Sequence, residues 1–133
     1  MLGEVARAAA ARDPEALLAH VGGDDFCIVT TPGLVDQIAE RCQEGFDAQA
    51  PLHYDDSDRR RGTITTHSRD GRRRQHKLMT LTLAAATAEA DDMRHIGQFF
   101  QVLAELKEYA KGHGGSAYVK DRRRHHGWDR ASQ

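Results

Sequence analysis

The sequence of 133 residues predicts a single domain of mixed structure, an α+β or α/β sandwich. Residues 34–48 and 95–111 carry apolar side chains at helical spacing. The short apolar runs 16–21 and 26–29 have the length and flanking glycines of strands. Because helices alternate with strands along the chain, we expect them to pack in layers.

The runs 16–21 and 26–29 flank two glycines, Gly22 and Gly23, and this pattern predicts a tight β-hairpin. A two-residue turn of this kind requires positive φ at its tip, which glycine adopts at no steric cost. Residues 26–29 are apolar at every position, and we therefore predict that the second strand lies inside a sheet.

Three helices are predicted. Residues 2–12 are rich in alanine, and Pro14 should end this first helix at or before residue 13. The second helix covers 34–48 and is followed by Pro51. The third covers 95–111, is amphipathic, and is followed by a glycine-rich segment.

The later strands are less clearly marked. Residues 55–75 are polar and charged, with a short exposed strand predicted at 62–67 and a turn at 69–72. Alternation of apolar and polar residues in its first half predicts a strand over 78–87, and residues 116–119 predict a final short strand. The expected order is helix, strand, strand, helix, strand, helix, strand.

Composition limits the partners that we expect. The chain has a net charge of −1 and a pI near 6.7, which gives no whole-chain argument for DNA or an anionic membrane. Basic triplets nevertheless occur at 59–61, 72–74 and 122–124. We interpret them as solvated loop and tail residues, with contact to phosphate as the alternative. We expect no DNA partner.

Two cysteines, Cys27 and Cys42, fit neither a disulfide framework nor a zinc site, and we expect both to behave as small hydrophobic residues. No signal peptide and no apolar run of membrane-spanning length is apparent, so we expect a cytoplasmic protein without a membrane segment. Residues 121–133 form a basic tail that we expect to be mobile.

The predicted hairpin carries two adjacent carboxylates beside its glycines, in the pentapeptide Gly22-Gly23-Asp24-Asp25-Phe26. Carboxylates next to a backbone without side chains suit a divalent cation and the phosphates of a nucleotide. The alternative is an ordinary Gly-Gly hairpin with two solvated aspartates.

This pentapeptide, within His20–Val29, resembles the signature of GGDEF domains, the diguanylate cyclase family. Residues 78–83, 103–111 and 116–119 are similar to the family's late strand, last helix and closing strand. The resemblance covers residues 1–120 and implies a partial GGDEF fold. Members of the family make cyclic di-GMP from two GTP molecules.

The resemblance implies roles for five residues. Gly22 and Gly23 would let the backbone approach the nucleotide, and Asp24 would be the catalytic carboxylate that activates the 3′-hydroxyl or stabilises the transition state. Asp25 would ligate Mg²⁺, and Lys111 would contact phosphate.

The chain also departs from the family pattern. Met1 lies where the family's second helix begins, so the first strand and helix, with a further metal-binding aspartate and the guanine-recognising residues, are expected to be absent. The family's arginine after the lysine falls at Gly115, and Arg12–Glu15 does not match its inhibitory site. Because the missing strand is central to the family's sheet, we expect a strand-swapped homodimer or a rearranged sheet.

Three functions follow from these residues. We expect a catalytically inactive GGDEF-like module of cyclic di-GMP signalling that binds GTP or acts in regulation and dimerisation. The alternative is the C-terminal part of an active diguanylate cyclase, functional when the missing N-terminal part is supplied. A polymerase-like palm also presents Gly-Asp-Asp on a hairpin, but it requires further acidic ligands.

Overall fold

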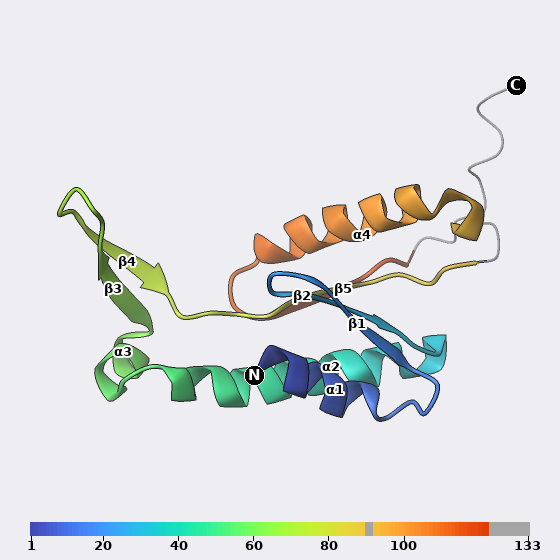
Figure 1. The fold of residues 1–133 in the computed structure, drawn as a ribbon, viewed down its shortest axis with the longest axis horizontal. Coiled ribbons are helices and arrows are strands. Elements are labelled where there is room, and N and C mark those ends of the chain that lie inside the picture. The colour runs from blue at the N-terminus through green and yellow to red at the C-terminus, as the bar shows by residue number, and fades with distance from the viewer. Residues whose placement is uncertain (90–91, 123–133) are drawn as a thin grey trace, which may run out of the picture. The chain divides into compact units, whose positions relative to one another are not determined.

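The computed structural model describes residues 1–89 and 92–122. The chain forms two compact units, residues 1–81 and residues from 82 onward (Figure 1). Mixed helix and strand content agrees with the predicted class. The described strands form three two-stranded sheets, β1–β2, β3–β4 and β5–β6. The predicted boundary after residue 120 stays a prediction, since residues 123–133 lie outside the described part of the chain.

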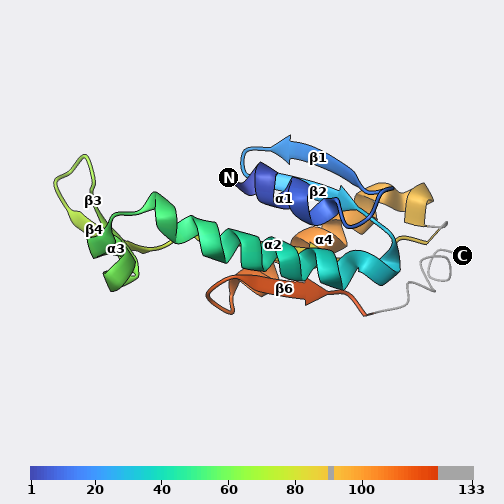
Figure 2. The same cartoon turned by 90° about the horizontal axis from the view of Figure 1, so that it is seen from below.

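Two helices build the core of the first unit. α1 (Leu2–Ala10) packs on α2 (Val35–Gln49), which is preceded by a short 3-10 turn, η1 (Pro32–Leu34), and followed by another, η2 (Ala50–His53) (Figure 2). Both helices were predicted. The buried side chains at helical spacing are Val5, Ala6, Ala9 and Ala10 of α1 and Ile38, Ala39, Cys42 and Phe46 of α2.

Small residues set the distance between α1 and α2. A Cβ added to Gly45 of α2 would lie 3.1 Å from Cγ1 of Val5, so glycine here lets the helices approach closely. Cys42 is buried as expected, and burial raises the pKa of its thiol, whereas Cys27 is only half-buried.

The glycine-centred hairpin is present as predicted. β1 (Leu17–Gly22) pairs antiparallel with β2 (Asp25–Val29), and both strands contact α1. The prediction that the second strand is interior was wrong, because β2 pairs with β1 alone among the described strands and Val29 is 59% exposed. Its apolar residues cover α1 instead of filling the middle of a sheet. In particular, a Cβ on Gly3 of α1 would lie 3.3 Å from the Phe26 ring.

A second hairpin follows α2, and the sequence predicted only part of it. α3 (Asp56–Arg61) has Asp55 as its N-cap and Gly62, with φ of 68°, as its C-cap. β3 (Thr63–His67) then pairs antiparallel with β4 (Arg73–Lys77). Neither α3 nor β4 was predicted, since both are polar and lack the apolar periodicity that marks an element.

The predicted turn between these strands is confirmed. Gly71, with φ of 77°, donates its N–H to the Ser68 carbonyl at 2.9 Å. The Asp70 carboxylate accepts hydrogen bonds from the Ser68 hydroxyl and the Arg72 N–H, and these bonds lower the pKa of Asp70. The turn is therefore held by its own side chains.

The second unit is a βαβ arrangement. β5 (Thr82–Ala85) and β6 (Ala117–Lys120) pair in parallel, with a 3-10 turn, η3 (Asp92–His95), and α4 (Ile96–Lys111) between them. α4 packs on both strands, as a crossover helix must to cover a parallel pair. The predicted strand over 78–87 was too long, because only 82–85 pair with another described strand, and residues 78–81 and 86–87 lie outside it.

One carboxylate joins the two ends of the β1–β2 hairpin. Asp13, between α1 and β1, is 5% exposed. Its Oδ2 accepts hydrogen bonds from the Thr30 hydroxyl at 2.6 Å, the Thr31 N–H at 2.9 Å and the Thr31 hydroxyl at 2.8 Å. Its Oδ1 accepts the Glu15 N–H at 2.9 Å. These bonds, led by that of Thr30, hold the pKa of Asp13 well below its usual range.

The first prediction concerns acid stability. Because the pKa of Asp13 is lowered in the folded state, its contribution to stability is fully present above an unfolded-state pKa near 3.8 and is lost as the pH falls below that value. In Asp13→Asn, an amide NH₂ or a single carbonyl oxygen must face donors that now share two carboxylate oxygens. We expect a lower midpoint of urea unfolding at neutral pH and a flatter loss of stability below pH 3.8.

Glu15→Gln, which removes the same charge from an exposed side chain, is the control. If Asp13→Asn and Glu15→Gln unfold at the same midpoint as the unaltered chain, Asp13 does not hold the hairpin.

Candidate functional site

The tip of the β1–β2 hairpin differs in one position from the predicted turn. Gly22 pairs with Asp25, so the two tip residues are Gly23 and Asp24 and not the two glycines. Gly23 has φ of 55°, and no non-glycine residue of the described chain has positive φ. A positive φ at the first tip residue alone matches a type II′ turn.

A β-bulge lies directly beside this tip. His20 pairs with Phe26 and Gly22 pairs with Asp25, which leaves Val21 as one extra residue on β1. A bulge bends the strand and re-aims the side chains that follow it. The strict alternation that would point Asp24 and Asp25 to opposite faces is therefore disturbed where they lie.

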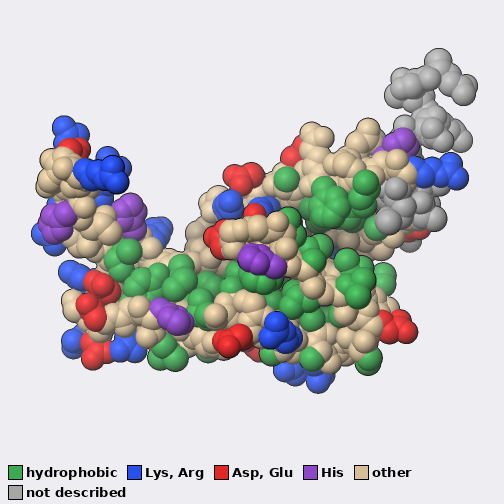
Figure 3. Space-filling view, in the orientation of Figure 1, with side chains coloured by type: hydrophobic (Ala, Val, Ile, Leu, Met, Phe, Trp, Pro, Cys, Tyr) green, Lys and Arg blue, Asp and Glu red, His purple; other side chains and the backbone are tan. Residues whose placement is uncertain are grey.

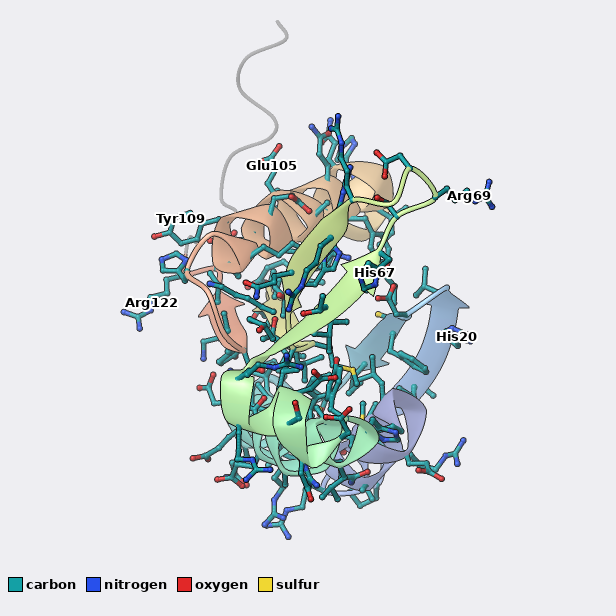
Figure 4. The ribbon with its side chains drawn as sticks, turned by 90° about the vertical axis from the view of Figure 1, so that its left-hand side faces the viewer. His20, His67, Arg69, Glu105, Tyr109 and Arg122 are labelled. Atoms are coloured by element: carbon teal, nitrogen blue, oxygen red, sulfur yellow. The ribbon has the colours of Figure 1, made fainter. Side chains whose placement is uncertain are left out.

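The His20 side chain, on β1, stabilises the turn at the tip of the hairpin (Figure 4). Its ring stacks on Phe26 with centroids 4.6 Å apart and an interplanar angle of 13°. Its Nε2 lies 2.8 Å from the Gly23 carbonyl oxygen, and the tautomer with hydrogen on Nε2 donates to it. This role was not predicted, because the expected Gly22-Gly23 turn would place His20 opposite Asp25, whereas the shifted tip and the bulge at Val21 bring it opposite Phe26.

The two carboxylates are exposed at the mouth of the hairpin. Asp24 and Asp25 are consecutive and solvent-accessible, and no atom lies within 4 Å of a Cβ built on Gly22 or Gly23. The backbone beside the carboxylates is thus open to a ligand. Over residues 1–89 and 92–122, no group of three or more His, Cys, Asp or Glu side chains is placed to hold a metal ion.

These donors fit Mg²⁺ in one particular manner. Mg²⁺ commonly binds through one or two carboxylates and completes its octahedron with water and substrate phosphates. Asp24 and Asp25 can supply the carboxylates, whereas a cage made by the protein alone would need more ligands than the described residues gather there.

Lys111, the fifth predicted residue, ends α4 in the second unit. Its Nζ lies 3.0 Å from Oε1 of Glu108, one turn earlier, in an exposed ion pair. The other four predicted residues lie together on one hairpin of the first unit. The nucleotide- and metal-binding roles of Gly22, Gly23, Asp24 and Asp25 and the phosphate-binding role of Lys111 stay predictions.

Comparisons with protein-family models, curated proteins and solved structures gave no match. No helix in the described part of the chain combines the length and the apolar character needed to cross a membrane. The resemblance to GGDEF domains therefore stays a prediction from the sequence.

The second prediction tests the backbone of the tip. Gly23→Ala places a Cβ on a left-handed residue, which costs about 1–2 kcal/mol. Gly33→Ala is the matched control, since Gly33 has negative φ and an equally open Cβ position. Urea unfolding should show a lower stability for Gly23→Ala and little change for Gly33→Ala. Equal effects would contradict the turn described here.

Proposed function

We propose that this chain is a GGDEF-like module of cyclic di-GMP signalling that binds a guanine nucleotide, GTP with Mg²⁺, in a regulatory and not a catalytic role. The hairpin carries the proposal: two consecutive exposed carboxylates adjoin two glycines, at a tip fixed by a histidine–carbonyl hydrogen bond. A GTP-binding role would place the protein in the cytoplasm.

The chemistry of binding follows from charge and access. The triphosphate is strongly anionic and would be repelled by Asp24 and Asp25 in the absence of a cation. A Mg²⁺ ion between the carboxylates and the phosphates removes that repulsion, and Asp25 is the proposed ligand. The open backbone at Gly22 and Gly23 lets the phosphates approach without meeting a side chain.

A binding role is favoured over catalysis by the number of acidic groups. Two-metal phosphoryl transfer requires ligands for two ions about 3.5–4 Å apart, together with groups that align both substrates. Asp24 and Asp25 alone provide two carboxylates, enough for one phosphate-bound Mg²⁺. Asp24 would become a catalytic residue only if further ligands were supplied from elsewhere.

The third prediction concerns nucleotide binding. Isothermal titration of the full chain with GTP should show binding in Mg²⁺ that is lost when EDTA replaces the metal. Asp25→Ala should weaken binding by about tenfold or more, which corresponds to about 1.4 kcal/mol. Glu44→Ala, a change to an exposed carboxylate on α2, should leave it unchanged.

Absence of Mg²⁺-dependent binding in the unaltered chain would contradict the proposal. Formation of cyclic di-GMP from GTP by this chain would instead support the cyclase alternative, and Asp24→Ala should then abolish the product.

We also propose that two copies of the chain associate through the β1–β2 hairpin. A two-stranded sheet has unpaired edges that favour addition of another strand. Leu17 and Val29 form a directly opposed pair on this hairpin and are 69% and 59% exposed. A second copy, with or without exchange of strands, would cover this apolar pair.

The fourth prediction is that multi-angle light scattering detects a dimer whose population falls on dilution. Val29→Lys should favour the monomer, because a lysine on a strand opposes edge-to-edge pairing. Leu52→Lys, at a residue that is 70% exposed on η2, should leave the dimer intact. If the unaltered chain is monomeric at all concentrations, the proposed dimer is wrong.

A further inference from the structure

The β3–β4 hairpin, residues 63–77, is an exposed and strongly basic element, which we call the basic ribbon. It carries five Lys and Arg residues against one Asp. Figure 3 shows Lys, Arg and His side chains gathered over this hairpin, at the left of the view. All five residues of β4, Arg73–Lys77, are exposed. The expectation of no DNA partner rested on the near-neutral net charge of the whole chain, which hides this local concentration.

Most of this charge has no acidic partner. Asp70 lies 3.7 Å from Nε of Arg72 and accepts hydrogen bonds within its own turn. In the described part of the chain, the remaining four cations have no carboxylate within ion-pair distance: Arg69, Arg73, Arg74 and Lys77. Like charges this close repel one another, so an anionic ligand would relieve the repulsion.

The strand register sorts these side chains by face. Lys77 is opposite Thr63, Gln75 is opposite Thr65, and Arg73 is opposite His67. Residues two apart on a strand share a face, so Arg73, Gln75 and Lys77 form a row of about 13 Å along one side of the ribbon. Arg74 lies on the other side, and Arg69 extends outward from the tip (Figure 4).

Hydrogen bonds fix the backbone of the basic ribbon at its base and at its tip in the absence of a ligand. At its base, the Leu78 N–H donates to the Gly62 carbonyl at 3.3 Å, and the Met79 N–H donates to the Tyr54 hydroxyl oxygen at 3.0 Å. At its tip, the Ser68 N–H donates to the Arg72 carbonyl at 2.9 Å. Little conformational entropy remains to be lost from the backbone on binding.

We propose that the basic ribbon binds duplex DNA by inserting into the major groove. That groove is about 12 Å wide and admits a two-stranded antiparallel ribbon. Arginine and lysine bind phosphate oxygens and the acceptor edge of guanine, and glutamine pairs with adenine, so the row Arg73, Gln75 and Lys77 offers both kinds of contact.

The same features argue against other polyanions. A-form RNA has a deep, narrow major groove that side chains do not reach. Stable attachment to an anionic membrane normally adds apolar side chains to a basic cluster. The turn 68–72 contains none, since it consists of serine, aspartate, glycine and arginine.

The fifth prediction is measured by fluorescence anisotropy of the full chain with a labelled mixed-sequence DNA duplex. If four cations contact phosphates, affinity should fall about 100-fold between about 50 and 200 mM salt. Arg73→Gln with Lys77→Gln should weaken binding and lower the slope of log K against log salt by about 2. Neither substitution alters a buried group, and circular dichroism should confirm an unchanged fold.

Two variants make the test specific. Arg7→Gln with Arg41→Gln removes the same charge from exposed positions on α1 and α2 and should leave the salt slope unchanged. Arg73→Lys retains the charge and should retain most of the affinity. The proposal is overturned by failure to bind the duplex at 50 mM salt, by equal losses in both double variants, or by tighter binding to duplex RNA or phosphatidylserine vesicles.

Discussion

The first unit depends on the hydrogen bonds that its Asp13 carboxylate accepts. This buried group joins the segment that enters β1 to the segment that leaves β2, through Thr30 and Thr31. A short two-stranded sheet has little stability of its own and requires support from packing or from its ends. Here Asp13 closes the base of the hairpin, and Phe26, close to the tip, packs against Gly3 of α1. The hairpin tip can therefore be exposed without the strands separating.

A fixed base and an open tip suit a binding hairpin. The stack of His20 on Phe26 and the hydrogen bond to the Gly23 carbonyl carry order from the strands into the turn. Asp24 and Asp25 then project from a backbone whose conformation is already set. Such preorganisation would lower the entropic cost of holding the proposed phosphate-bound cation, for which Asp24 and Asp25 would supply the carboxylates.

Charge is distributed unevenly over the molecule. Arg59 and Arg61 of α3 are paired with Asp56 and Asp58 in the same helix, so this basic triplet is largely neutralised by its neighbours. The triplet at 72–74 spans the end of the turn and the start of the exposed strand β4, where Asp70 pairs with Arg72. Two runs of three arginines thus have different electrostatic character, and the difference arises from the spacing of nearby aspartates on a helix and on a hairpin.

The sequence by itself determined the elements whose signals are local. Alanine content located α1, apolar spacing located α2 and α4, and glycine chemistry located the β1–β2 hairpin and the turn after β3, because propensity, periodicity and positive φ depend on near neighbours. Tertiary structure decided what depends on distant partners: β2 lies at a sheet edge, β4 pairs despite being polar, and 78–81 remain outside a sheet. It also gave Asp13 its role, since Thr30 and Thr31 are brought to that carboxylate only when the hairpin closes.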